Sequence, residues 1–170
     1  DSCHPVERVT VIPQGQALGI TVALPDEDRL LATRAECLDR LAMMMAGRAA
    51  EELVFGEFTT GAADDLARAA TLARQMVTQL GMGGDTTEAS LAIGLPPIPG
   101  AGMEDAAEAA ARDLVNAAYR RALELLRENR DLLRRSAELL MEREAIERDE
   151  IIDILGPRPV QPRLEALVRA

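Results

Sequence analysis

The sequence of 170 residues contains no lysine and no tryptophan, only one histidine and only two cysteines. The histidine, His4, lies at the start of the chain, so no Ser-His-Asp or Cys-His catalytic arrangement can be built from these residues, and we interpret it as an exposed side chain. Cys3 and Cys37 occur in dissimilar contexts, so we expect no disulfide framework and favour a reducing compartment.

Aromatic residues make up only 2% of the chain, although 48% of it is hydrophobic. The core must therefore consist of Leu, Ile, Val, Ala and Met, a composition that favours helices packed closely through small side chains. Four methionines, Met43, Met44, Met45 and Met76, are interpreted as flexible gap-fillers in this core, rather than as a stripe for a cofactor or partner.

The chain carries a net charge of −10, and all of its 19 basic residues are arginines. This balance argues against a nucleic-acid surface, which requires clustered cations. There is no Walker A loop to hold a nucleotide phosphate. There is also no signal peptide and no apolar run of membrane-spanning length. Because the sequence does not begin with Met, we expect it to be a piece of something longer.

Periodicity predicts a mainly α fold, a helical bundle with a small N-terminal β-hairpin or sheet. The two strands are expected at residues 8–12 and 17–24. The helices are expected at about 33–56, 62–80, 103–129, 131–143 and 149–155. Apolar spacing predicts the inward-facing residues of the first four helices, which include Leu41, Met45, Leu80, Ala117, Leu125, Leu133, Ala137, Leu140 and Met141. Residues 1–155 are expected to form one domain, and 156–170 to be a proline-containing tail. The segment 81–102, rich in Gly and Pro, is a long irregular connection of the kind that is often functional.

Two features mark helix starts. Thr33 and Glu36 fit a capping box before the first long helix. The stretch "TTGAADDL" (59–66) places Asp64 and Asp65 in the first turn of the next helix. Composition and spacing alone favour a purely structural role for this pair, in which the carboxylates complement the helix dipole and cap free amides.

Three blocks of the chain, in order and spacing, resemble the peptidase domain of FtsH-type ATP-dependent zinc metalloproteases. They read "PVERVTVIPQGQALGITVALPDEDR" (5–29), "LLATRAECLDRLAMMMAGRAAEELVFGEFTTGAADDLARAATLARQMVTQLGMG" (30–83) and, more loosely, "AAYRRALELLRENRDLLRRSAELLMEREAIERDEIIDIL" (117–155). The combination of "GRAAEELVFGE" with "TTGAADDL" is highly specific, and the similarity covers nearly the whole chain.

The resemblance implies that Asp65 is a zinc ligand, because it matches the Asp of the family's "TTGAxND" block. Asp64 stands where the family usually has Asn. The Arg and Glu residues of "GRAAEE" (Arg48, Glu51 and Glu52) are then expected either to organise the helix near the metal or to have a structural role.

The second predicted strand matches the family's edge strand, which pairs with an extended substrate. We therefore expect a substrate-binding strand at Ala17, Leu18, Gly19, Ile20, Thr21 and Val22.

The zinc site of the family also needs the two histidines of an HExxH helix, whose Glu acts as the base. No HExxH occurs in these 170 residues, and no catalytic residue is identifiable. The chain is thus expected to be a truncated or divergent member of the family, inactive by itself and holding zinc weakly or not at all. The alternative is a catalytically silent homologue that serves as an oligomerisation or client-docking module.

The resemblance further implies partners. The family's domain forms a homo-hexameric ring and acts on unfolded or membrane proteins. An AAA+ ATPase module lies in the same parent chain. We therefore expect a soluble, cytosol-facing domain of a membrane-anchored parent. The less specific alternative is an acidic helical domain that binds another protein without any metal.

Overall fold

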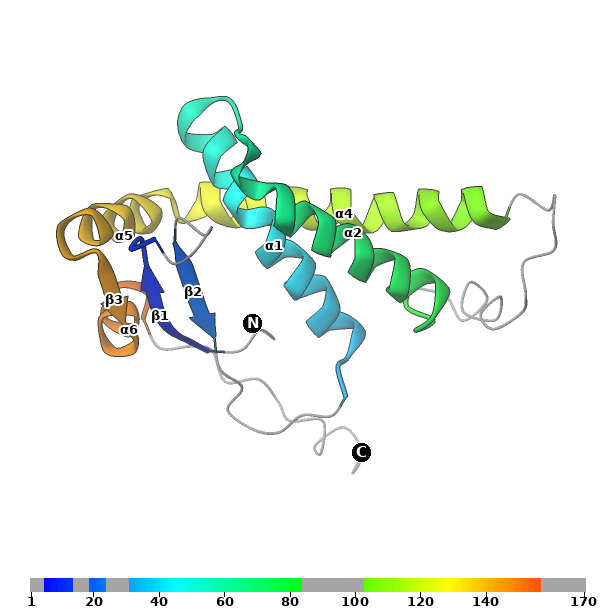
Figure 1. Ribbon diagram of the computed structural model, residues 1–170, viewed down its shortest axis with the longest axis horizontal. Coiled ribbons are helices and arrows are strands. Elements are labelled where there is room, and N and C mark those ends of the chain that lie inside the picture. Colours follow the sequence, from blue (N-terminus) through cyan, green and yellow to red (C-terminus); the bar gives the residue numbers. More distant parts are fainter. Residues whose placement is uncertain (1–4, 14–18, 24–30, 84–102, 157–170) are drawn as a thin grey trace. The chain divides into compact units, whose positions relative to one another are not determined.

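A computed structural model describes residues 5–13, 19–23, 31–83 and 103–156, without the side chains of 103–105 (Figure 1). Helices dominate, and a small antiparallel sheet accompanies them, which confirms the predicted fold class. The strands are β1 (Val6–Thr10), β2 (Ile20–Ala23) and β3 (Ala145–Glu147). The helices are α1 (Arg34–Phe55), the 3₁₀-helix η1 (Thr60–Ala62), α2 (Ala63–Thr78), α4 (Met103–Glu128), α5 (Arg130–Arg143) and α6 (Arg148–Leu155).

The chain divides into two compact units. One combines the N-terminal segment Asp1–Leu30 with the C-terminal segment Asn129–Ala170, and the other is the continuous segment Leu31–Glu128. The sheet and helices α5 and α6 belong to the first unit. Helices α1, α2 and α4 and the 3₁₀-helix belong to the second.

The sheet of the first unit has the strand order β2-β1-β3. On β1, Val9 lies opposite Thr21 of β2 and opposite Ile146 of β3. The third strand was not predicted, because three residues between two helices are too few to show an alternating pattern. It is positioned by Glu144, the left-handed residue (φ 63°) that ends α5 and whose carbonyl accepts hydrogen bonds from the amide of Val11 and the hydroxyl of Thr10.

Helices α5 and α6 complete this unit, with α6 packed against β1, β3 and α5. The prediction that α5 buries Ala137 and Met141 is wrong. Among the described residues α5 has no buried side chain, and Met141 is 84% exposed. The helix carries charged residues around most of its circumference. Solvated ion pairs, such as Arg134 with Glu138, therefore support it more than burial in a core does.

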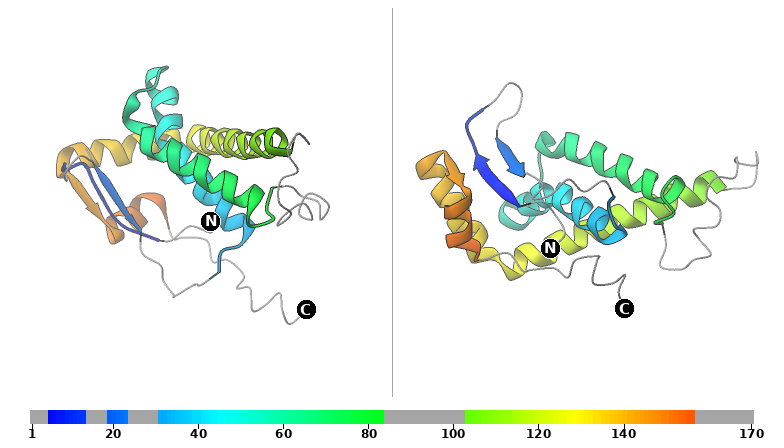
Figure 2. Two further views of the ribbon diagram at one scale, coloured as in Figure 1. Left: turned by 45° about the vertical axis from the view of Figure 1, so that its right-hand side comes forward. Right: turned by 90° about the horizontal axis from the view of Figure 1, so that it is seen from below.

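The core of the second unit lies where α1, α2 and α4 pack against one another, as both views of Figure 2 show. Leu41, Met45 and Met76 are its largest fully buried side chains. Ala49, Ala69 and Ala73 are also completely buried. Because alanine has no side chain beyond Cβ, these positions let the helix backbones approach closely, as the composition predicted.

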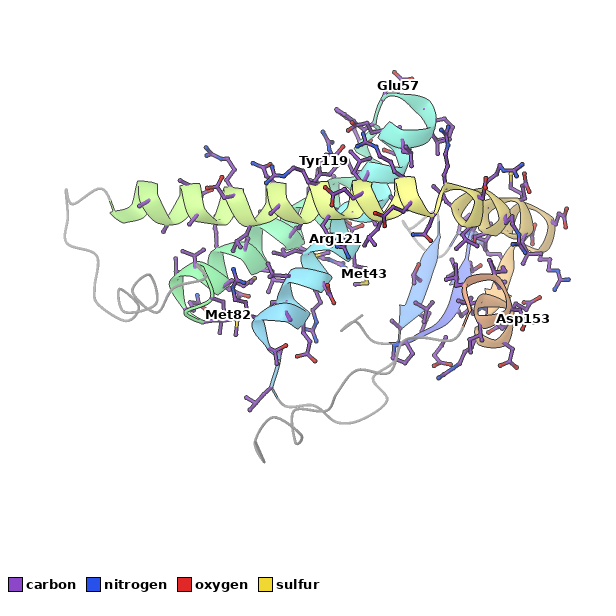
Figure 3. The ribbon with its side chains drawn as sticks, turned by 180° about the vertical axis from the view of Figure 1, so that it is seen from behind. Met43, Glu57, Met82, Tyr119, Arg121 and Asp153 are labelled. Atoms are coloured by element: carbon purple, nitrogen blue, oxygen red, sulfur yellow. The ribbon has the colours of Figure 1, made fainter. Side chains whose placement is uncertain are left out.

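Several predicted core positions are wrong. Leu80 lies beyond the end of α2 and is half exposed, Leu125 near the end of α4 is 39% exposed, and Ala117 is exposed. Ala111 and Leu123 are buried instead. The methionine prediction holds for Met45 and Met76, but Met43 is half exposed on the outer side of α1 (Figure 3).

The start and end of α1 follow the capping signals. The Thr33 hydroxyl accepts from the Glu36 amide at 3.2 Å, and the Glu36 carboxylate accepts from the Thr33 amide at 2.6 Å. This confirms the predicted capping box. Gly56 ends the helix in the left-handed conformation (φ 74°), which costs glycine little. No helix in the described ranges combines the length and hydropathy needed to cross a bilayer.

Candidate functional site

The candidate site is the connection between α1 and α2, which carries the "TTGAADDL" stretch. After Gly56 the chain turns at Glu57, which lies at the far tip of this connection in Figure 3. It then returns through Phe58 and Thr59 into the 3₁₀-helix η1, which continues directly into α2. The connection therefore folds back along the last two turns of α1.

Glu51 of α1 holds this connection. One carboxylate oxygen accepts a hydrogen bond from the Thr59 amide at 2.9 Å, and the other accepts from the Thr59 hydroxyl at 2.7 Å. The hydrogen bond from the Thr59 backbone lowers the pKa of Glu51 below its ordinary value, and the Thr59 hydroxyl and the charge of Arg48 act in the same direction. Glu51 is consequently ionised at neutral pH, the state that accepts both bonds.

Gly61 completes the turn. The Thr59 oxygen that donates to Glu51 also accepts from the Gly61 amide at 3.1 Å and so caps η1. A Cβ at Gly61 would lie 3.2 Å from that oxygen and 4.0 Å from a carboxylate oxygen of Glu51. Glycine is therefore suited to this position because of the close packing of the turn, and not because of a positive φ.

Arg48 and Glu52, the other two residues singled out in "GRAAEE", also have defined partners. The Arg48 guanidinium lies over the ring of Phe58, 3.6 Å from its centroid. Glu52 accepts a hydrogen bond from the hydroxyl of Tyr119 on α4. The prediction about this group did not anticipate Thr59, Phe58 or Tyr119 as its partners. A Thr two residues before a Gly is a known turn-forming signal, but the long-range contact of Tyr119 leaves no local trace.

Asp64 and Asp65 lie in the first turn of α2, and both are exposed. The residue before the helix, Ala62, is buried and provides no side-chain cap. The carboxylates therefore lie at the positive end of the helix dipole, as expected from the sequence. The Asp65 carboxylate is solvent-accessible and is available as an oxygen ligand.

The described residues do not, on their own, fit a zinc ion. Zinc sites in proteins use three or four side-chain ligands. Within the part of the chain that the structure describes, no three His, Cys, Asp or Glu side chains converge on one point. Cys37 is a free thiol buried in the core of the second unit, and His4 lies outside the described residues. Asp65 is thus a single candidate ligand.

The predicted substrate strand is shorter than expected. Ala17 and Leu18 lie outside the described residues, Gly19 precedes the strand, and β2 begins at Ile20. Within the described sheet, β2 pairs only with β1 and is an edge strand. At Gly19, a Cβ would lie 2.8 Å from the carbonyl oxygen of Thr10, so glycine permits a close approach of the two backbones.

Similarity to known proteins identifies the family of this mainly helical chain. The family model for peptidase family M41 matches residues 1–154, and the chain belongs to this family. It is 45% identical to the ATP-dependent zinc metalloprotease FtsH of Kosmotoga olearia, covering 91% of this chain and 26% of the relative.

Two further relatives carry the same description. The chain is 41% identical to FtsH of Thermotoga maritima, over 90% of this chain and 27% of the relative. It is 38% identical to FtsH 3 of Symbiobacterium thermophilum, over 94% of this chain and 29% of the relative. The chain thus spans about a quarter of the length of the relatives it matches.

Proposed function

We propose that this chain is the main part of the proteolytic domain of an ATP-dependent zinc metalloendopeptidase that degrades unfolded or membrane proteins. Asp65 supplies one zinc ligand, and the remaining ligands and the catalytic base come from residues outside the 170. The observation that carries this proposal is the exposed Asp65 carboxylate at the start of a helix, after a turn bonded to α1. The names and extensive similarity of the relatives support it.

The proposal extends to assembly. The domain works as a homo-hexamer together with an AAA+ module of the same parent chain, and the parent is anchored in a membrane. The 170-residue chain alone is inactive, because a single carboxylate holds zinc weakly and no base accompanies it. Residues 1–155 act as the peptidase domain, whereas the expected tail, apart from Gly156, lies outside the described residues.

The decisive experiment starts from the parent open reading frame. We expect an HExxH upstream of Asp1 and Walker motifs further upstream. In the purified parent protein, Asp65→Ala should remove bound zinc, whereas Asp64→Ala, which has the same change in the preceding residue, should retain it. Equal zinc content in both variants would contradict the ligand role. A parent without HExxH would favour the silent docking module instead.

The isolated chain offers a second check. We expect no hydrolysis of casein with added zinc, and chelator-sensitive cleavage by this chain would contradict the proposed dependence on residues outside it.

The edge strand β2 is proposed to bind extended segments of protein substrates through its free main-chain groups. Successive amides of a strand point to opposite edges, so Thr21 and Val22 provide a matched pair. One of the substitutions Thr21→Pro and Val22→Pro should remove a free edge amide and weaken peptide binding without unfolding the sheet. The other should disrupt pairing with β1. Unchanged peptide affinity in both variants would argue against substrate binding there.

A further inference from the structure

The connection between α1 and α2 is held at successive points by one face of α1. Arg48 lies against Phe58, and Glu51, one turn later, binds Thr59. These four residues are close to the surface and none belongs to the buried core. Specific polar and cation–π contacts at the surface therefore help to hold this turn in place, beside the buried Ala62.

The start of α2 depends on this connection. The helix has no side-chain cap of its own, and its first turn follows η1 without an intervening loop. The direction of the first turn is therefore set by η1, which in turn is set by Thr59. Among the described residues, the side chain from outside the turn that hydrogen-bonds to Thr59 is that of Glu51.

We infer that Glu51 is a positioning residue. Its carboxylate fixes the Thr59–Ala62 turn against α1 and thereby sets the direction in which the Asp65 side chain projects from the first turn of α2. This inference rests on the proposed function in so far as Asp65 binds zinc. Glu51 itself is not assigned as a ligand, since both of its oxygens accept hydrogen bonds from Thr59.

The first experiment tests the turn in the 170-residue chain. Glu51→Gln and Thr59→Val remove acceptor or donor groups with little change in shape, whereas Thr59→Ser keeps the hydroxyl. Hydrogen exchange of the Thr59 and Gly61 amides should accelerate about five- to tenfold in the first two variants, as expected for loss of a hydrogen bond. Exchange at core residues such as Leu41 and the thermal midpoint should change little, and Thr59→Ser should behave as the wild type.

Glu57→Gln is the matched control, since it removes the same charge from the same connection at a residue outside the turn contacts. Wild-type exchange of Gly61 in Glu51→Gln would overturn the inference. A uniform acceleration throughout the second unit would also overturn it, because it would show that Glu51 only stabilises the fold.

The second experiment measures zinc retention against a chelator in the parent protein. Glu51→Gln and Thr59→Val should release zinc at about tenfold lower chelator concentration, the scale seen when groups that orient a metal ligand are altered. Thr59→Ser, which keeps the hydroxyl, should retain zinc as the wild type does. If Asp65→Ala removes zinc but the Glu51 and Thr59 variants retain it fully, the positioning role fails while the proposed function stands. If Asp65→Ala itself retains zinc, the proposed function fails, and exchange in the first experiment still decides whether Glu51 fixes the turn.

Discussion

Arg74 of α2 and Glu108 of α4 form a two-point ion pair. The Nε and Nη2 atoms of Arg74 each donate to a different oxygen of Glu108, both at 2.8 Å. The hydrogen bond from Arg74 lowers the pKa of Glu108, and the same bond raises the pKa of Arg74. The pair thus joins, at the surface, the two helices whose alanines meet in the core.

This pair should contribute little to stability, because both side chains are solvent-exposed. We expect Arg74→Gln and Glu108→Gln to lower the denaturation midpoint slightly. The double variant should lose less than the sum of the two, and added salt should shrink all three differences. A double-mutant cycle by urea denaturation, at low salt and at about 1 M salt, measures this. Strict additivity at low salt would show that the two groups do not interact in solution.

The capping box of α1 allows a more specific prediction. Thr33→Ala removes the hydroxyl that accepts from the Glu36 amide, and should cost about 1 kcal/mol in the free energy of unfolding. Thr33→Ser retains the hydroxyl and should cost only a fraction of that. Chemical denaturation of the three proteins compares them directly, and equal stability of the Ala and wild-type proteins would contradict the capping role.

The methionines provide a contrast between buried and exposed positions. Met76 is fully buried between helices, so Met76→Ala should destabilise the protein by about 2–5 kcal/mol through lost burial and a residual cavity. Met141→Ala makes the same chemical change at an exposed position of α5 and should be nearly neutral. Thermal and urea unfolding distinguish them, and similar losses for both would show that α5 is covered in solution.

The Glu51 carboxylate makes part of the stability dependent on pH. Because its pKa in the folded protein is lowered below 4.5, the stabilisation is present above pH 4.5 and is lost as the pH falls through the lowered folded value. The difference between the wild type and Glu51→Gln in the protection of the Gly61 amide against hydrogen exchange should therefore be constant from neutral pH to about pH 4.5 and then close. Glu57→Gln serves again as the control. A difference that persists under strong acid would show that the Gln variant fails for a reason other than charge.

Much of the fold was predictable because its signals are local. Thr33 and Glu36 define the start of α1 by their own hydrogen bonds, and the apolar spacing through Leu41 and Met45 predicts which side of that helix is buried. The predicted positions of Leu125 and Met141 failed for a tertiary reason, since the sequence shows that a helix has an apolar side but not how far along that side a neighbour extends.

The candidate site, too, was predictable only in part. Spacing alone placed Asp64 and Asp65 in the first turn of a helix, and the resemblance singled out Asp65. The sequence by itself thus determined the helices, the absence of an HExxH in these residues and the one candidate ligand. Only the tertiary structure showed that Glu51 binds Thr59, that Tyr119 binds Glu52 and that β3 joins β1. The sequence separation is 8 positions for the Glu51–Thr59 contact, 67 for Glu52–Tyr119 and more than 130 for β1 and β3. Such contacts form only where the packed helices and strands bring distant parts of the chain together.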